Sequence, residues 1–232
     1  MLPHWLAMLG GLSVALAALE TENAANRAQR FARTFQKVVK RDGATNRSIA
    51  SGGGSTREYT LATRSHLHTV VTAFGVRSIL DIPCGDFQWM PIFLDAHPEI
   101  RYFGADIVRA LIAEHTSRFS DRPQWAFGVA DMVRDFPAGE FDLVHMRDAL
   151  QHLSPGDAVS VITSLRIQSR FRYWMVTDYE GVTHNRESRI RNKGWDFQYH
   201  NLRLPPYSLP PPLMRFNESA DGKTLALYRI PF

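Results

Sequence analysis

Acidic residues stand at the ends of three short apolar segments of this chain, at a spacing that suits nucleoside binding. Asp81 ends the segment Ser-Ile-Leu-Asp and precedes a turn that contains Gly85, while Asp106 and Asp131 end the next two segments. In an open α/β sheet, a glycine-bearing turn after the first strand lets a ligand approach the backbone. An acid at the tip of the following strand then accepts hydrogen bonds from ribose hydroxyls. The pattern therefore predicts an adenosine-binding crevice.

The segments around these acids alternate between expected strands and expected helices. Strands are expected at 78–83, 101–106, 125–130, 141–146 and 172–178, and helices at 56–74, 88–96, 107–119, 148–153 and 156–168. Such alternation is typical of a parallel sheet with right-handed crossovers. Two last apolar segments, 213–218 and 223–230, flank Asp221-Gly222, which is a hairpin signal. We expect a mostly parallel α/β sheet with helices on both faces and a C-terminal antiparallel hairpin.

Residues 20–41 repeat apolar side chains at spacings of three and four, Phe31 and Phe35 among them, and place basic residues between them. This periodicity predicts an amphipathic helix. The helix either packs on the sheet with its basic face in solvent or binds a membrane surface.

Residues 1–19 contain no charged side chain and are mostly apolar. The segment is interpreted as a membrane anchor, a helix lying on the domain or on a membrane surface, or a cleaved signal. Basic residues follow it, and by the positive-inside rule they would place the remainder on the cytoplasmic side. We therefore divide the chain into an apolar segment, 1–19, and one domain, 20–232.

The bulk composition narrows the class of protein. A chain of 232 residues with 44% apolar content can bury one substantial core. The net charge of +4 is modest, and no nucleic-acid partner is expected. The single cysteine, Cys84, excludes a disulfide framework, favours a reducing compartment and is interpreted as a small buried residue. We predict no metal site, because no His/Asp/Glu cluster has metal-ligand spacing.

Several motifs resemble those of class I S-adenosylmethionine-dependent methyltransferases. The first motif of that superfamily usually reads Asp-x-Gly-x-Gly-x-Gly, and residues 81–87 align with it, with Gly85 kept and Pro83 and Phe87 in place of two glycines. The span 31–232 resembles a poorly characterised branch of the superfamily. Its motifs occur here at Ser51–Ser55, Leu80–Met90, Gly104–Val108, Arg147–Ser154 and Trp195–Pro206. The resemblance implies a Rossmann-like class I methyltransferase fold and S-adenosylmethionine as methyl donor, and says little about the methyl acceptor.

The resemblance also implies roles for individual residues. Asp81 and Gly85 would line the methionine end of the donor, and Asp106 would bind the ribose. Asp131 and Met132 would meet the adenine. The loop 51–55 either places its backbone amides over the methionyl carboxylate or is an ordinary turn. The full set of implied donor contacts is Ser51, Gly53, Ser55, Asp81, Pro83, Gly85, Asp86, Trp89, Asp106, Ile107, Asp131, Met132 and Arg147.

A candidate base follows the fourth expected strand. Methyl transfer from a sulfonium requires mainly alignment, whereas a hydroxyl acceptor also requires a proton acceptor. Asp148 and His152 are four residues apart in an expected helix, where the carboxylate would orient the imidazole. Alternatively, Asp148 and Gln151 form a capping box and His152 braces the fold. Asp86 is the competing carboxylate.

The acceptor site is expected to be walled by Trp89, Tyr179, Trp195 and Tyr199, together with Asn201. Enzymes that methylate amino groups of nucleobases resemble one another in an Asn/Asp-Pro-Pro-Tyr motif at the end of the fourth strand. Met-Arg-Asp-Ala stands there in this chain and disfavours that activity. The leading hypothesis is O-methylation of a sugar or other small hydroxylated acceptor. The alternatives are N-methylation of a protein or small amine, and a non-catalytic adenosine-binding or membrane-associated module.

Overall fold

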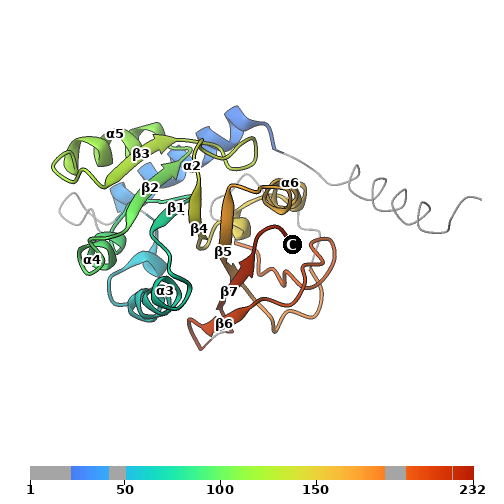
Figure 1. Cartoon of the computed structure of the whole chain (residues 1–232). Coiled ribbons are helices and arrows are strands. Elements are labelled where there is room, and N and C mark those ends of the chain that lie inside the picture. Colours follow the sequence, from blue (N-terminus) through green and yellow to red (C-terminus); the bar gives the residue numbers. More distant parts are fainter. Residues whose placement is uncertain (1–21, 42–50, 186–196, 221) are drawn as a thin grey trace, which may run out of the picture.

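The centre of the protein is a seven-stranded sheet with the strand order β3-β2-β1-β4-β5-β7-β6 (Figure 1). The computed structural model describes residues 22–41, 51–185, 197–220 and 222–232. The strands are β1 (Ser78–Asp81), β2 (Arg101–Asp106), β3 (Trp125–Val129), β4 (Phe141–Met146), β5 (Phe171–Asp178), β6 (Met214–Asn217) and β7 (Thr224–Arg229). Strands β1 to β5 pair in parallel, and β7 runs antiparallel to both β5 and β6. The expected parallel sheet with a terminal antiparallel hairpin is confirmed.

Helices cover both faces of this sheet. Helices α3 (Leu61–Phe74) and α4 (Met90–Asp95) lie on one face and α6 (Pro155–Arg166) on the other, while α5 (Arg109–Arg118) contacts β2 and β3. The strands supply alternate residues to two buried clusters. Ile79 joins the cluster beside α3 and α4, and the next residue, Leu80, joins the cluster beside α6. All four residues of β1 are therefore buried, as in a strand covered on both faces.

Local sequence signals explain where several helices begin and end. The Ser154 hydroxyl accepts a hydrogen bond from the Asp157 amide and caps α6, whose first residue is Pro155. Gly75 ends α3 with a φ of 62°, in the left-handed region that suits glycine. The expected helix 56–74 begins only at Leu61.

The amphipathic helix expected at 20–41 is confirmed as α2 (Ala24–Arg41), and its inner face is packed against the domain. Arg27 is buried, and Phe31 packs against the cluster that contains α6 residues. The apolar segment 1–19 lies outside the described residues, so its three interpretations stay predictions. Among the helices that the structure describes, none is both long and apolar enough to cross a membrane.

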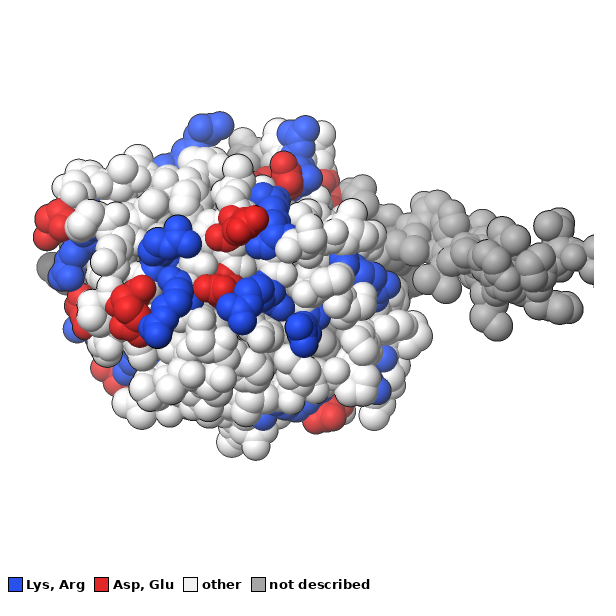
Figure 2. Space-filling model, viewed as in Figure 1, with Lys and Arg blue, Asp and Glu red and all other residues white. Residues whose placement is uncertain are grey.

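Charges of both signs are mixed on the face of the molecule seen in Figure 2. Lys and Arg side chains there have Asp and Glu side chains close beside them. This face therefore does not present a surface of a single sign to a polyanion.

Candidate active site

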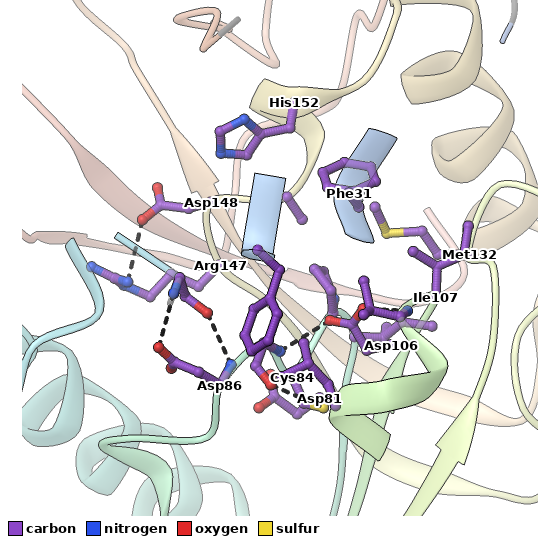
Figure 3. A pocket seen from close by; sticks show the side chains of 18 of the residues that line it. Phe31, Asp81, Cys84, Asp86, Asp106, Ile107, Met132, Arg147, Asp148 and His152 are labelled. Atoms are coloured by element: carbon purple, nitrogen blue, oxygen red, sulfur yellow. Dashed lines mark hydrogen bonds and ion pairs between the residues drawn. The ribbon is translucent and has the colours of Figure 1, made fainter. Parts of the chain in front are cut away.

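A cleft lies at the carboxyl ends of β1, β2, β3 and β4, beneath α2. Parallel α/β sheets commonly bind ligands at this edge. Most of the residues that the sequence singled out come together here (Figure 3). They are Ser51, Ser55, Asp81, Pro83, Gly85, Asp86, Trp89, Asp106, Ile107, Asp131, Met132, Arg147, Asp148 and His152. Gly53, Tyr179 and Asn201 do not line the cleft, and Trp195 lies outside the described residues.

Asp106, the expected ribose contact, ends β2 with its carboxylate buried. One oxygen accepts a hydrogen bond from the Gly85 amide at 3.1 Å, and the other from the Val108 amide at 2.9 Å. Burial raises the pKa of Asp106 to about 6, although these amides favour the charged form. Each carboxylate oxygen can accept a further hydrogen bond, so two ligand hydroxyls can be bound here.

The loop 51–55 is bound to the turn after β1. The Ser51 amide donates to the Asp86 carboxylate at 2.8 Å, and the Asp86 amide donates to the Ser51 hydroxyl at 2.9 Å. Gly85 has a φ of 56°, and a Cβ there would lie 2.6 Å from the Ser51 hydroxyl oxygen, so a side chain at this position would collide with the loop. Burial raises the pKa of Asp86 to about 6.

Phe87 stands where the superfamily motif usually has a glycine, and it adopts a glycine-like φ of 54°. Its ring is enclosed by aromatic residues, with ring centres 5.1 Å from Tyr102 and 5.0 Å from both Phe119 and Phe127. On α5, the His115 imidazole hydrogen-bonds the Gly85 carbonyl at 2.8 Å. The turn is therefore held from behind by β2, β3 and α5.

Asp81 lines the cleft, but its carboxylate is also bound within the core. It accepts hydrogen bonds from His145 and from the Tyr102 hydroxyl, both at 2.7 Å. Trp89 packs edge-on against His145, at 5.7 Å between ring centres. Cys84 is buried, and burial together with the nearby carboxylates raises the pKa of its thiol well above the usual value. The thiol therefore stays protonated, as expected of a small buried residue rather than a nucleophile.

Asp131, the expected adenine contact, forms a two-point ion pair with Arg27 of α2. The Arg27 Nε and Nη2 atoms donate to the two Asp131 oxygens at 3.2 and 2.9 Å. Sequence reasoning missed Arg27 as a site residue, and also missed Phe31, Thr34 and Phe35, which line the cleft from the same helix. The apolar periodicity of residues 20–41 identified the inner face of α2 but not the surface that this face covers.

The expected helix over 148–153 is wrong. Asp148 has a φ of 52°, incompatible with a right-handed helix, and only residues Leu150–His152 form a short 3-10 turn. The Asp148 carboxylate accepts from Lys223 Nζ at 2.5 Å and lies 3.2 Å from Arg147 Nη1. The Asp148 amide donates to the Thr177 hydroxyl, and Ala149 precedes the turn without a side-chain cap, so the capping box is also wrong.

His152 and Asp148 both line the cleft (Figure 3). The orienting interaction expected between them stays a prediction. The imidazole lies between two aromatic rings. Its ring centre is 6.4 Å from Phe31 and 5.1 Å from Phe197, both in edge-to-face contact.

The remaining predicted acceptor residues lie beside the cleft rather than in its wall. Tyr179 is buried against Tyr199, with 4.6 Å between ring centres. The Asn201 amide donates to the Glu180 and Val182 carbonyls at 3.0 and 2.8 Å, so this side chain fixes the local backbone. Among the described residues, no group of three or more His, Cys, Asp or Glu side chains is placed to hold a metal ion.

A family model described as a methyltransferase domain matches residues 79–167, the span from β1 to the end of α6. This part of the chain is thus similar to a methyltransferase domain. The expectation of an S-adenosylmethionine-dependent methyltransferase is confirmed at this level. No curated protein sequence matches the chain significantly.

Solved methyltransferase structures share the fold. The N-methyltransferase NodS from Bradyrhizobium japonicum, in complex with S-adenosylhomocysteine, has a TM-score of 0.60 at 13% identity, over 88% of this chain and 100% of that one. The Burkholderia thailandensis 1,6-didemethyltoxoflavin-N1-methyltransferase has a TM-score of 0.61 at 14% identity, over 90% of this chain and 91% of that one. The mitomycin 7-O-methyltransferase MmcR has a TM-score of 0.58 at 16% identity, over 89% of this chain and 67% of that one. At these identities the similarity shows the fold alone.

Proposed function

We propose that the methyltransferase domain transfers a methyl group to a hydroxyl of a small acceptor, such as a sugar. The observation that carries this proposal is the position of His152, whose imidazole lies in the wall of the donor cleft between Phe31 and Phe197. A hydroxyl is a poor nucleophile until a base accepts its proton, and an imidazole suits that role near neutral pH. The neighbouring aromatic rings offer flat apolar surfaces to an acceptor.

The charges of the cleft fit the methyl donor. Asp86 and Asp106 are buried carboxylates with backbone or hydroxyl partners, and the described part of the chain places no cationic side chain in an ion pair with either. A buried anion without a cation is costly. S-adenosylmethionine has a sulfonium, an ammonium and ribose hydroxyls, all of which suit such carboxylates. When bound, it supplies a methyl group that is already activated.

Different residues of the cleft would hold the adenine, the ribose and the methionyl part of the donor. Asp106 binds the ribose hydroxyls, and Asp131 with Met132 meets the adenine. Asp86 and the loop 51–55 hold the methionyl end together with Arg147. His152 accepts the proton of the acceptor hydroxyl on a ring nitrogen. The proposal includes membership of this chain in the poorly characterised branch of the superfamily whose motifs its sequence resembles.

The test is an assay with isotopically labelled donor and matched panels of small hydroxylated compounds and amines. Label is expected on oxygen, and His152→Gln should lower kcat by about 10²-fold or more, the usual contribution of a general base, with the affinity for S-adenosylhomocysteine unchanged. His66→Gln, at a half-buried histidine outside the cleft, is the matched control.

Two results would refute the proposal: label transferred to nitrogen alone, or a full rate in His152→Gln. N-methylation remains the second candidate, because NodS and the toxoflavin enzyme are N-methyltransferases.

A further inference from the structure

A buried ion-pair group of Arg27, Asp131 and Asp157 attaches α2 to the domain. The Arg27 side chain is 3% exposed and reaches Asp131 after β3 as well as Asp157 in the first turn of α6, the latter through Nη1 at 2.9 Å. The pKa of Arg27 is raised, because its hydrogen bonds and charge contacts with these acids outweigh the opposing effect of burial. One guanidinium thus joins α2 to two separate elements of the domain.

A second set of contacts extends the attachment toward the acceptor side. The Glu22 amide donates to Asp157 at 3.0 Å, and the Glu22 carboxylate pairs with Arg30 at 2.8 Å. Arg30 Nη2 also donates to the His152 carbonyl at 3.1 Å. The N-terminal turns of α2 are therefore bound both at the adenine side of the cleft and beside the proposed base.

Between these attachments, α2 forms part of the wall of the cleft. Arg27, Phe31, Thr34 and Phe35 all line it, on the side where Asp131 and Met132 would meet the adenine. Figure 3 shows Phe31 on the same side of the cleft as Met132 and Ile107. The docked α2 therefore covers this side of the cleft, and a movement of α2 away from the domain would open it.

We propose that Arg27 is a positioning residue that couples the docking of α2 to the binding of the methyl donor. This inference rests on the proposed donor site, because Asp131 is its adenine-side carboxylate. Arg27 holds both Asp131 oxygens in one orientation, while their remaining lone pairs accept the adenine amino group. A donor that binds better beneath the docked helix must stabilise the docked helix to the same extent, since coupling between two events is reciprocal.

The experiment compares Arg27→Met and Asp157→Asn with Arg33→Met in the full chain. Arg33 is exposed on the same helix, whereas Asp157 contacts Arg27 without lining the cleft. For each protein, stopped-flow mixing gives the dissociation rate of S-adenosylhomocysteine. Amide hydrogen exchange is measured in α2 and, as a check of the fold, in β1 and β4, each with and without this ligand.

In the wild-type protein, S-adenosylhomocysteine should slow amide exchange in α2. Both Arg27→Met and Asp157→Asn should lose that slowing and release the ligand about tenfold faster or more, within the usual range of coupling. Exchange in β1 and β4 should be unchanged, and Arg33→Met should match the wild type.

The coupling is wrong if S-adenosylhomocysteine binds but leaves exchange in α2 unaltered. It is also wrong if Asp157→Asn releases the ligand at the wild-type rate. A wild-type protein that does not bind S-adenosylhomocysteine would instead refute the donor site itself, and the proposed function with it. Because Asp157 cannot touch the donor, an accelerated release in its variant reports the attachment of α2 rather than a lost ligand contact.

Discussion

At the scale of single residues, two buried carboxylates dominate the electrostatics of the cleft. Asp86 and Asp106 are 7% and 6% exposed, and burial raises the pKa of each to about 6. Both are held by backbone amides, which fix their orientation but supply no positive charge. The site is thus prepared for a ligand that brings hydroxyl donors and positive charge.

Asp106→Asn should weaken the binding of S-adenosylhomocysteine by about 1–3 kcal/mol, because ribose hydroxyls would lose a charged acceptor. Isothermal titration calorimetry at pH 7.5 measures the dissociation constant. Asp121→Asn, at a largely exposed carboxylate outside the cleft, should leave it unaltered. An equal affinity in Asp106→Asn and the wild type would contradict the ribose assignment.

The acidic residues at the strand ends could be predicted from the sequence, whereas the residues that bind them from distant parts of the chain could not. Asp81, Asp106 and Asp131 follow apolar segments, and the alternation of the chain brings such strand ends to one edge. Arg27 lies 104 residues before Asp131, and no local pattern relates the two. The contact depends on where α2 packs, which only the tertiary structure determines.

At the scale of elements, the hairpin β6–β7 reaches back to the site. Lys223, just before β7, pairs with Asp148 at 2.5 Å and with Glu218 at 3.2 Å. Glu218 also pairs with Arg147, and its side chain is fully buried. The hairpin therefore holds the residues that follow β4 through a buried group of charges.

Lys223→Met should lower the free energy of unfolding by about 3–5 kcal/mol, the usual cost of removing one partner of a buried ion pair. Urea denaturation followed by circular dichroism provides the measurement. Arg229→Met, at an exposed position in β7, should change stability by less than about 0.5 kcal/mol. A loss in Lys223→Met as small as that of the control would show that the buried charges do not depend on Lys223.

These non-local contacts also explain why the helix expected at 148–153 fails. The spacing of Asp148, Gln151 and His152 is compatible with a helix, but the Asp148 amide is bound by Thr177 and its carboxylate by Lys223. Both partners come from strands or turns much later in the chain, and they stabilise a left-handed backbone that Asp tolerates better than most residues. Local propensity therefore gives way to tertiary contacts.

At the scale of the whole molecule, the buried carboxylates should affect stability as a function of pH. In the folded protein Asp86 and Asp106 have pKa values of about 6, raised from 3.8, so the folded state binds more protons than the unfolded state between these values. Their contribution to stability therefore falls as the pH rises through 6. His115 and His200, whose pKa values burial lowers, oppose this trend.

The double variant Asp86→Asn/Asp106→Asn isolates the carboxylate contribution, because both histidines are retained. Its free energy of unfolding relative to the wild type should increase between pH 5 and pH 7.5, by about 1.4 kcal/mol per carboxyl group, the linkage that corresponds to one pH unit below a pKa of about 6. Denaturation without ligand at each pH gives the difference. A difference that stays constant with pH would show that neither group titrates in this range.

The overall architecture was more predictable than the site, because it depends on short-range patterns. Strands β2 and β4 have the expected bounds, and the remaining strands differ by only a few residues at their ends. Apolar runs, turn residues and the alternation of strands with helices suffice to predict the architecture of the sheet. The covering of the cleft by α2, and the loss of the helix expected at 148–153, arise from packing between elements far apart in sequence.

Phe87 has a consequence for how a donor-binding turn can be built. A glycine-rich loop is ordered by its ligand and loses conformational entropy when the ligand binds, whereas this turn is already fixed by the rings that enclose Phe87. Association should therefore cost less entropy here. Pattern searches that count glycines will overlook chains in which a buried aromatic side chain performs the same task.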